Sequence, residues 1–192
     1  EAFSEDAVLS GTLAANVIKG AKSKGVRMYL KHLVLSEEGP NPSQLNVWLT
    51  EQNLRENYLK SFEIAVKEGG ANSVMSSFNR LGGTWTGGNY ALLTNILRNE
   101  WGFKGAVITD WCVGDNDMTV ERGIRAGNDI WLSPQDRCNN GLDESSASSW
   151  YCARRSAKNL LYAICETYYF AKTYDPTADI GIGKIADVFR WW

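Results

Sequence analysis

The residues best suited to chemistry stand directly after apolar segments of the chain. Asp110 follows the apolar run at residues 106–109 and precedes Trp111. A carboxylate in that setting is costly unless it is hydrogen-bonded or takes part in a reaction, so a loop cap and a reactive carboxylate are both consistent with its position. The aromatic face of Trp111 could pack on the C–H face of a sugar ring, although a core position is the commoner one for tryptophan.

Lys31 and His32 form a second candidate group, because both can donate hydrogen bonds to the hydroxyls of a ligand. A plain surface location is the commoner one for such a pair. His32 is the only histidine among the 192 residues, so a histidine-rich metal site is excluded, and a Ser-His-Asp or Cys-His constellation could be built only around it. The glycines at residues 82–88 lack the spacing of the P-loop and dinucleotide-binding motifs. We therefore expect neither a metal nor a cofactor.

The composition excludes several functional classes. Lys and Arg number 20 against 22 Asp and Glu, so the chain lacks the broad basic face of a nucleic-acid-binding protein. It has no run of about eighteen apolar residues, so we expect no membrane-spanning helix. The four cysteines are too few for a disulfide scaffold; we expect thiols, although the spacing allows a Cys138–Cys152 bridge. No signal-peptide pattern is present, which leaves the compartment open and favours the cytoplasm.

An alternation of strand and helix signals must position the candidate residues. Short apolar runs between turn residues predict four strands, at residues 26–30, 73–76, 106–109 and 129–132. Apolar residues at helical spacing predict helices after the N-cap candidates Ser10, Thr50 and Asp117, and at residues 92–101 and 153–170. Residues 81–88 and 134–149 are rich in glycine or polar residues and predict loops.

Strands that alternate with helices indicate parallel βα units and therefore an α/β fold. Right-handed crossovers place the carboxyl ends of all strands on one side, so Lys31-His32, residues 77–79, Asp110-Trp111 and Ser133 are expected to converge at one rim. That rim is where α/β enzymes carry their chemistry. Four βα units compare with eight in a complete (β/α)8 barrel of about 250 residues. The sequence therefore predicts a partial TIM-barrel-like domain or a small open sheet.

Six stretches of the chain follow one another in a recognisable order. They are SED with LSG (residues 4–6 and 9–11), KH (31–32), LRENYLKSFE (54–63), VMSSFNR (74–80), LLT with WGFKG (92–94 and 101–105) and TDW (109–111). Together they resemble the catalytic barrel of glycoside hydrolase family three, the β-glucosidase-like enzymes. The resemblance covers residues 1–170 as a partial catalytic barrel and leaves residues 171–192 as a C-terminal tail or linker.

The resemblance implies a retaining hydrolase of β-linked sugars. The aspartate of the family's T/S-D-W motif maps to Asp110, which would attack the anomeric carbon and form a glycosyl-enzyme intermediate that water then hydrolyses. The family's K-H pair maps to Lys31 and His32, which would hydrogen-bond sugar hydroxyls. Met75, Phe78 and Trp111 would complete the substrate-binding residues around the sugar.

The chain also departs from the family pattern. Phe78 occupies the position of a tyrosine that orients the nucleophile in the family, so this hydroxyl is missing. Leu33 and the stretch SEEG at residues 36–39 replace a family segment that begins with Phe and ends with Arg. The early barrel strands would precede Glu1, and the family's acid/base glutamate would lie in a later domain. No glutamate in the chain matches that acid/base motif.

Three hypotheses about function follow. The first is a β-glucosidase-type hydrolase with Asp110 as nucleophile, incomplete as an isolated chain. The second is a sugar-binding or inactive remnant that keeps Asp110, Lys31 and His32. The third is a non-catalytic module that oligomerises through open sheet edges and the aromatic tail at residues 189–192. The expected partners are a β-glucoside or a related sugar, a second copy of the chain, or the missing barrel and acid/base segments, with no nucleic acid and no membrane.

Overall fold

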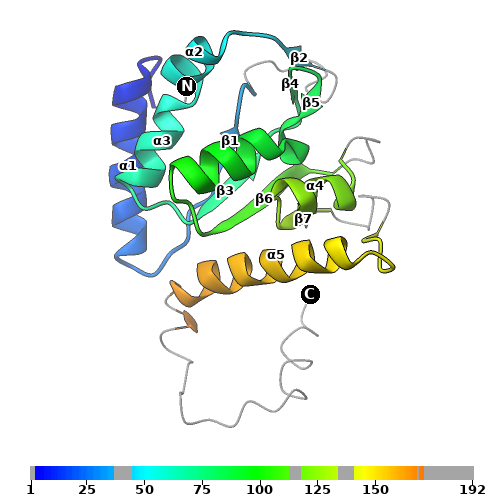
Figure 1. Cartoon of the computed structure of the whole chain (residues 1–192). Helices are drawn as coiled ribbons and strands as arrows, with labels where there is room; N and C mark the ends of the chain where they lie inside the picture. The colour runs from blue at the N-terminus through cyan, green and yellow to red at the C-terminus, as the bar shows by residue number, and fades with distance from the viewer. Residues whose placement is uncertain (1–2, 37–44, 113–117, 134–140, 168, 171–192) are drawn as a thin grey trace.

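The computed structural model describes residues 3–36, 45–112, 118–133, 141–167 and 169–170, and in them it confirms the expected α/β architecture. Four parallel strands form one sheet in the order β1-β3-β6-β7, and a smaller sheet has the order β2-β4-β5 (Figure 1). The main strands are β1 (Leu30–Leu33), β3 (Ser73–Ser76), β6 (Ala106–Trp111) and β7 (Ile130–Leu132). The described helices include none that is long and apolar enough to cross a membrane. The expected tail at residues 171–192 lies outside the described residues.

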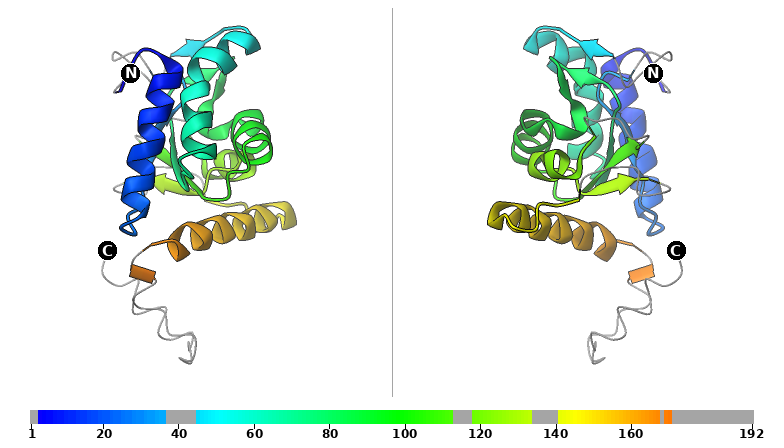
Figure 2. Two further views of the ribbon diagram at one scale, coloured as in Figure 1. Left: turned by 90° about the vertical axis from the view of Figure 1, so that its left-hand side faces the viewer. Right: turned by 90° about the vertical axis from the view of Figure 1, so that its right-hand side faces the viewer.

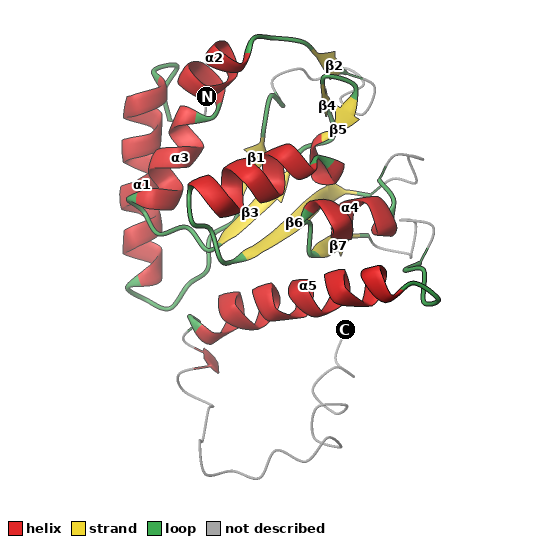
Figure 3. Cartoon of the chain, in the orientation of Figure 1, coloured by secondary structure: helices red, strands yellow, loops and turns green. Residues whose placement is uncertain are grey.

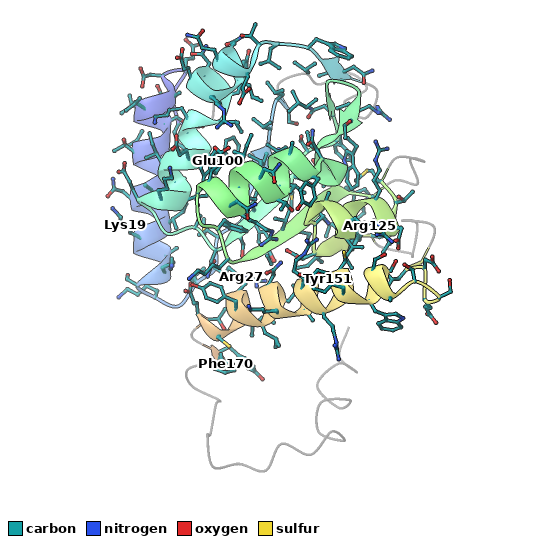
Figure 4. All side chains as sticks on the ribbon, viewed as in Figure 1. Lys19, Arg27, Glu100, Arg125, Tyr151 and Phe170 are labelled. Atoms are coloured by element: carbon teal, nitrogen blue, oxygen red, sulfur yellow. The ribbon has the colours of Figure 1, made fainter. Side chains whose placement is uncertain are left out.

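Helices flank the main sheet at both ends. α1 (Ala7–Lys22) and α3 (Lys60–Lys67) lie side by side next to β1, whereas α5 (Ala147–Cys165) runs past β7 (Figures 1 and 3). Figure 2 shows the same separation of α1 and α5 from two further directions. The remaining helical segments are α2 (Glu51–Asn53), η2 (Leu54–Tyr58), η3 (Thr86–Gly88), η4 (Ala91–Glu100) and α4 (Val120–Ala126). Side chains fill the space between these helices and the sheet (Figure 4).

The first strand is shifted from its predicted place. The apolar alternation at residues 26–30 predicts a strand there, yet the observed strand begins only at the end of that run. Met28 is exposed, so the alternation does not reflect burial, whereas Leu33 at the end of β1 is fully buried. Lys31 and His32 consequently lie inside the strand rather than after it. The other three strands lie at or within two residues of their predicted positions.

The N-cap predictions are correct for only some of the helices. Thr50 does cap α2, because its hydroxyl accepts a backbone N–H from the first turn at 3.2 Å. Ser10 is wrong as a cap: it is buried inside α1, whose N-cap is Asp6. Asp117 lies outside the described residues, and Thr119 is the residue that caps α4. Serine, threonine and aspartate are all favoured N-cap residues, so the presence of one of them does not identify the cap among neighbouring candidates.

The loop predicted at residues 81–88 contains regular structure. β4 (Arg80–Leu81) and β5 (Thr84–Trp85) form a hairpin, and β2 (Asn46–Val47) pairs with β4 in parallel. The turn residues Gly82 and Gly83 have φ of 58° and 81°, values that favour glycine in a two-residue hairpin turn. The buried Trp85 donates its indole N–H to the carbonyl of Ser77 at 2.9 Å. This bond fixes the small sheet beside the carboxyl end of β3.

The predicted loop at residues 134–149 is shorter than expected. α5 begins at Ala147, six residues before the predicted start of this helix, and ends at Cys165. Residues 141–146 form the part of the loop that is described. The earlier part of the loop lies outside the described residues.

The expectation of thiols is confirmed for Cys152 and Cys165 and is wrong for Cys112, and the alternative bridge is also wrong. Cys152 is a free, buried thiol on α5 and Cys165 is a free, exposed thiol, so the Cys138–Cys152 pairing is wrong. Cys152 belongs to the buried face of α5, which turns it toward the interior and away from the loop. Cys112, which follows β6, is disulfide-bonded, and its partner lies outside the described residues.

The hydrophobic core lies between the main sheet and its helices. Its most buried side chains are Leu33, Val74 and Val107 from the strands and Leu92, Leu93 and Leu97 from η4. β3 and β6 approach each other closely at their amino ends, where Ala106 N–H donates to the carbonyl of Asn72 at 3.1 Å. A Cβ atom at Gly105 would collide with that same carbonyl oxygen. Glycine is therefore required at the start of β6.

A buried ion pair joins the amino end of β6 to its surroundings. Arg98 on η4 contacts the Asp129 carboxylate at 2.7 Å, and the two side chains are 10% and 1% exposed. Arg98 also donates to the Gly105 carbonyl at 3.0 Å. Asp129 accepts the Val107 N–H at 2.8 Å and the amide of Asn159 on α5 at 2.9 Å. Burial raises the pKa of Asp129 and lowers that of Arg98, and their mutual attraction opposes both effects.

Replacing Arg98 by methionine should destabilise the fold strongly. The substitution leaves the Asp129 carboxylate buried without its cation, a loss that costs about 3–5 kcal/mol in comparable sites. Urea unfolding of the two proteins measures the difference. Lys67→Met is the matched control, because the Lys67–Glu63 pair lies at the surface with its side chains 45% and 26% exposed and should contribute less than about 1 kcal/mol. Equal losses for the two variants would show that the buried pair is not a major source of stability.

Candidate active site

The main sheet brings together two of the candidate residues, Asp110 and His32. Asp110 is the second-last residue of β6, and its Oδ2 atom lies 3.3 Å from Nε2 of His32 on β1. The two side chains are 13% and 27% exposed, respectively. The other carboxylate oxygen, Oδ1, accepts the backbone N–H of Trp111 at 2.7 Å. The two residues come from strands that are not adjacent, because β3 lies between β1 and β6.

The surroundings of His32 favour its neutral form. Burial lowers the pKa of the imidazole, the Asp110 carboxylate raises it, and the charge of Lys31 lowers it further, with a net lowering from the ordinary 6.5. At neutral pH the site therefore combines a neutral imidazole with a carboxylate. A partly exposed carboxylate beside a neutral donor can act as a nucleophile or as a general base.

A cavity of about 530 Å³ opens beside this pair. Its lining includes Lys31 and His32 and also Glu5, Asn57 and Tyr58. Asp110 is not among the lining residues, so His32 connects the cavity to the carboxylate. The cavity has enough volume for a small polar ligand and offers it cationic, neutral and anionic groups.

The other candidate residues take different positions. Met75, in β3, is partly buried, and Trp111 is 47% exposed at the end of β6. Phe78 packs against a small cluster of Trp85, Cys112 and Met118. None of these three candidates lines the cavity. Trp111 follows Asp110 directly in β6, and its ring is exposed.

Three residues of the cavity carry no clear signal in the sequence. Tyr58 has the spacing of an apolar helical stripe, but it lines the cavity together with its neighbour Asn57. Glu5 lies just before α1 and stands out only as part of a family motif. Asn57 is simply polar and Tyr58 lies on an apolar helical stripe. Neither property indicates that this end of the helical segment lines a cavity. The packing of α1 against η2 places these segments together, and the sequence does not reveal that packing.

Comparison with known proteins gives one consistent result. The family model described as "Glycosyl hydrolase family 3 N terminal domain" matches residues 1–148. A β-glucosidase of Rhizobium radiobacter is 45% identical over 180 residues, which is 91% of this chain and 22% of that protein. A β-glucosidase of Ruminococcus albus is 35% identical over 190 residues, which is 90% of this chain and 19% of that protein.

Solved structures show the same likeness. β-Glucosidase 3B from Thermotoga neapolitana, in complex with α-D-glucose, superposes with a TM-score of 0.78 at 33% sequence identity. The match covers 96% of this chain and 27% of that chain. The chain thus spans less than a third of the length of these relatives.

The pKa of His32 should respond to its two charged neighbours in opposite directions. Asp110→Asn removes the charge that raises this pKa and should lower it further, whereas Lys31→Met should raise it. Because the folded state favours the neutral ring, the linked stability is present above pH 6.5 and is lost as the pH falls below this value. An NMR titration of the imidazole measures the pKa of His32 in the wild type, in Asp110→Asn and in Lys31→Met. A wild-type pKa at or above 6.5, or a rise in Asp110→Asn, would contradict the expected effects of burial and charge on His32.

Proposed function

Because the chain belongs to glycosyl hydrolase family 3, as part of its N-terminal domain, we propose that Asp110 is the nucleophile of a retaining β-glycosidase. The observation that carries the proposal is the placement of Asp110. Its carboxylate stands near the carboxyl end of a buried parallel strand, 3.3 Å from the imidazole of a neutral histidine. Active sites of α/β barrels lie at this end of the sheet.

The proposed reaction proceeds in two displacements. An Asp110 oxygen forms a bond to the anomeric carbon while the bond to the leaving oxygen breaks, and that oxygen takes a proton from an acid. Water then attacks the same carbon, gives its proton to the conjugate base and releases Asp110. Two inversions retain the configuration of the sugar.

The acid/base group is assigned to a part of the enzyme beyond these 192 residues. Retaining glycosidases hold a second carboxyl about 5–5.5 Å from the nucleophile, and no glutamate of this chain matches the family's acid/base motif. The chain covers only 22% of the Rhizobium radiobacter β-glucosidase, which leaves most of such an enzyme to supply the group. Activity is therefore proposed for the larger protein.

The sugar itself would be held by residues around the carboxylate. Lys31 and His32 present hydrogen-bonding groups to the cavity, and bonds of this kind to sugar hydroxyls accelerate the reaction when they strengthen in the transition state. The exposed ring of Trp111 offers a face for the sugar's C–H groups, and Met75 lies on the strand between β1 and β6. A β-glucoside is the proposed substrate, because the relatives are named β-glucosidases.

Asp110→Ala in the protein that carries this chain should abolish turnover of an aryl β-glucoside. Loss of the nucleophile is expected to lower kcat/KM by at least about a thousandfold. Added azide should restore turnover and yield the α-glycosyl azide, because the small anion takes the place of the missing carboxylate.

Asp143→Asn is the matched control, since this carboxylate is exposed and lies in a loop before α5. Equal turnover by wild type and Asp110→Ala would refute the assignment. If neither protein hydrolyses the aryl β-glucoside but glucose raises the Tm of the wild type, the alternative of a sugar-binding remnant gains support.

We also propose that the isolated chain self-associates. β1 and β7 are the outer strands of the described main sheet, and unpaired strand edges tend to pair with another chain. On α1, Leu9, Leu13 and Val17 stand four residues apart and are 50%, 41% and 45% exposed, so they form an apolar stripe on one face of the helix.

Size-exclusion chromatography with light scattering should therefore give a mass above 21.4 kDa for the isolated chain. Lys substitutions at Leu13 and Val17 should shift the mass toward that of the monomer. A monomeric wild-type peak would show that these surfaces are insufficient for association.

A further inference from the structure

The carboxylate of Asp110 has two polar contacts among the residues that the structure describes. One is the backbone N–H of Trp111, the next residue in the chain, at 2.7 Å. This donor moves with Asp110 itself and cannot fix the carboxylate relative to the rest of the sheet. The other is Nε2 of His32 at 3.3 Å, from a strand that is two positions away in the sheet.

We propose that His32 is the positioning residue of Asp110, with its Nε2–H donating to Oδ2 and fixing the plane of the carboxylate. The proposal rests on the proposed function of Asp110 as nucleophile. It assigns to His32 a role on the enzyme's own carboxylate, separate from any contact with the sugar.

The aromatic side chain of Phe78 cannot take this positioning role. Phe78 belongs to the segment that follows β3, between the two strands concerned, and its ring packs on Trp85, Cys112 and Met118. Phenylalanine has no polar side-chain atom, so it can neither donate to the carboxylate nor replace the imidazole. Among the described residues, the histidine is therefore the side chain from another strand that can orient Asp110.

The proposed bond requires one particular tautomer of His32. A carboxylate can only accept hydrogen bonds, and a neutral imidazole carries its single proton on one nitrogen. To donate to Oδ2, Nε2 must therefore carry that proton, which leaves Nδ1 as an acceptor. Because His32 also lines the cavity beside Lys31, Nδ1 is available to accept a hydroxyl of the sugar. Hydrogen bonds in such a chain strengthen one another, so sugar binding would reinforce the hold on Asp110.

Two amide substitutions separate this role from simple packing. In the protein that carries this chain, His32→Gln places an amide nitrogen near the position of Nε2, whereas His32→Asn places one near Nδ1. Gln should retain the rate of glycosyl-enzyme formation within about tenfold of wild type, and Asn should lose about a hundredfold, the loss typical of a reacting group misplaced by about 1 Å. The burst phase with an activated aryl β-glucoside measures this rate.

The outcomes decide between the alternatives. A rate of glycosyl-enzyme formation that is clearly higher in His32→Gln than in His32→Asn supports the positioning role. A residue that only fills space would not distinguish the two amides. Equal rates, or Asn above Gln, would overturn it. An effect confined to KM, with kcat unchanged, would also overturn it and would assign His32 to sugar binding alone.

A second measurement does not depend on activity. The ¹⁵N shifts of His32 in the isolated chain report its tautomer without ambiguity, because this chain has one histidine. We expect the Nε2–H form, and we expect Asp110→Ala to weaken this preference. A predominant Nδ1–H form in the wild type would overturn the positioning role and leave the nucleophile assignment intact. Failure of the nucleophile assignment would appear instead as full activity in Asp110→Ala.

Discussion

A buried guanidinium–carboxylate pair fixes the amino end of the strand on which the candidate site depends. Arg98 and Asp129 lie almost completely out of water, where each charge alone would be strongly unfavourable. Their hydrogen bonds to the Gly105 carbonyl and the Val107 N–H hold β6 at its start. The bond from Asn159 adds α5 to the same cluster. η4, β6, the turn before β7 and α5 are thereby locked to one another by one pair of charges.

The anchored strand determines where the candidate site lies. Asp110 is three residues beyond Val107, which places it roughly 10 Å along β6. β1 and β6 are two strand spacings apart, again roughly 10 Å, yet the side chains of His32 and Asp110 meet. The strand between them ends at the small, buried Ser76, and the equally buried Ser77 follows it. Convergence of side chains from alternate strands is a property of curved, barrel-like sheets.

The sequence predicted the parallel sheet and the shared edge of Asp110, Lys31 and His32, because apolar runs and alternating helices follow simple periodic rules. It did not predict the contact between His32 and Asp110, which depends on strand order and curvature. The start of β1 was missed because an apolar alternation does not show which residues form backbone hydrogen bonds with a neighbouring strand.

Other features needed tertiary context as well. The glycine-rich pattern predicts a loop where the hairpin at Gly82-Gly83 lies, although two adjacent glycines are also a hairpin signal. Tyr58 has the spacing of a core residue, and only the packing of neighbouring helices shows that it lines the cavity. Local patterns specify the elements, whereas the site arises from how those elements are packed.

The close approach at Gly105 has a consequence for the interpretation of mutational scans. Every coding change at this position introduces a Cβ atom where the Asn72 carbonyl already lies, so the strand that carries Asp110 would be displaced from its neighbour. A scan scored by activity alone would place Gly105 beside Asp110 among the least tolerant positions. Protein abundance would separate them, because the glycine is required for the strand to form, whereas the role proposed for Asp110 lies in the reaction.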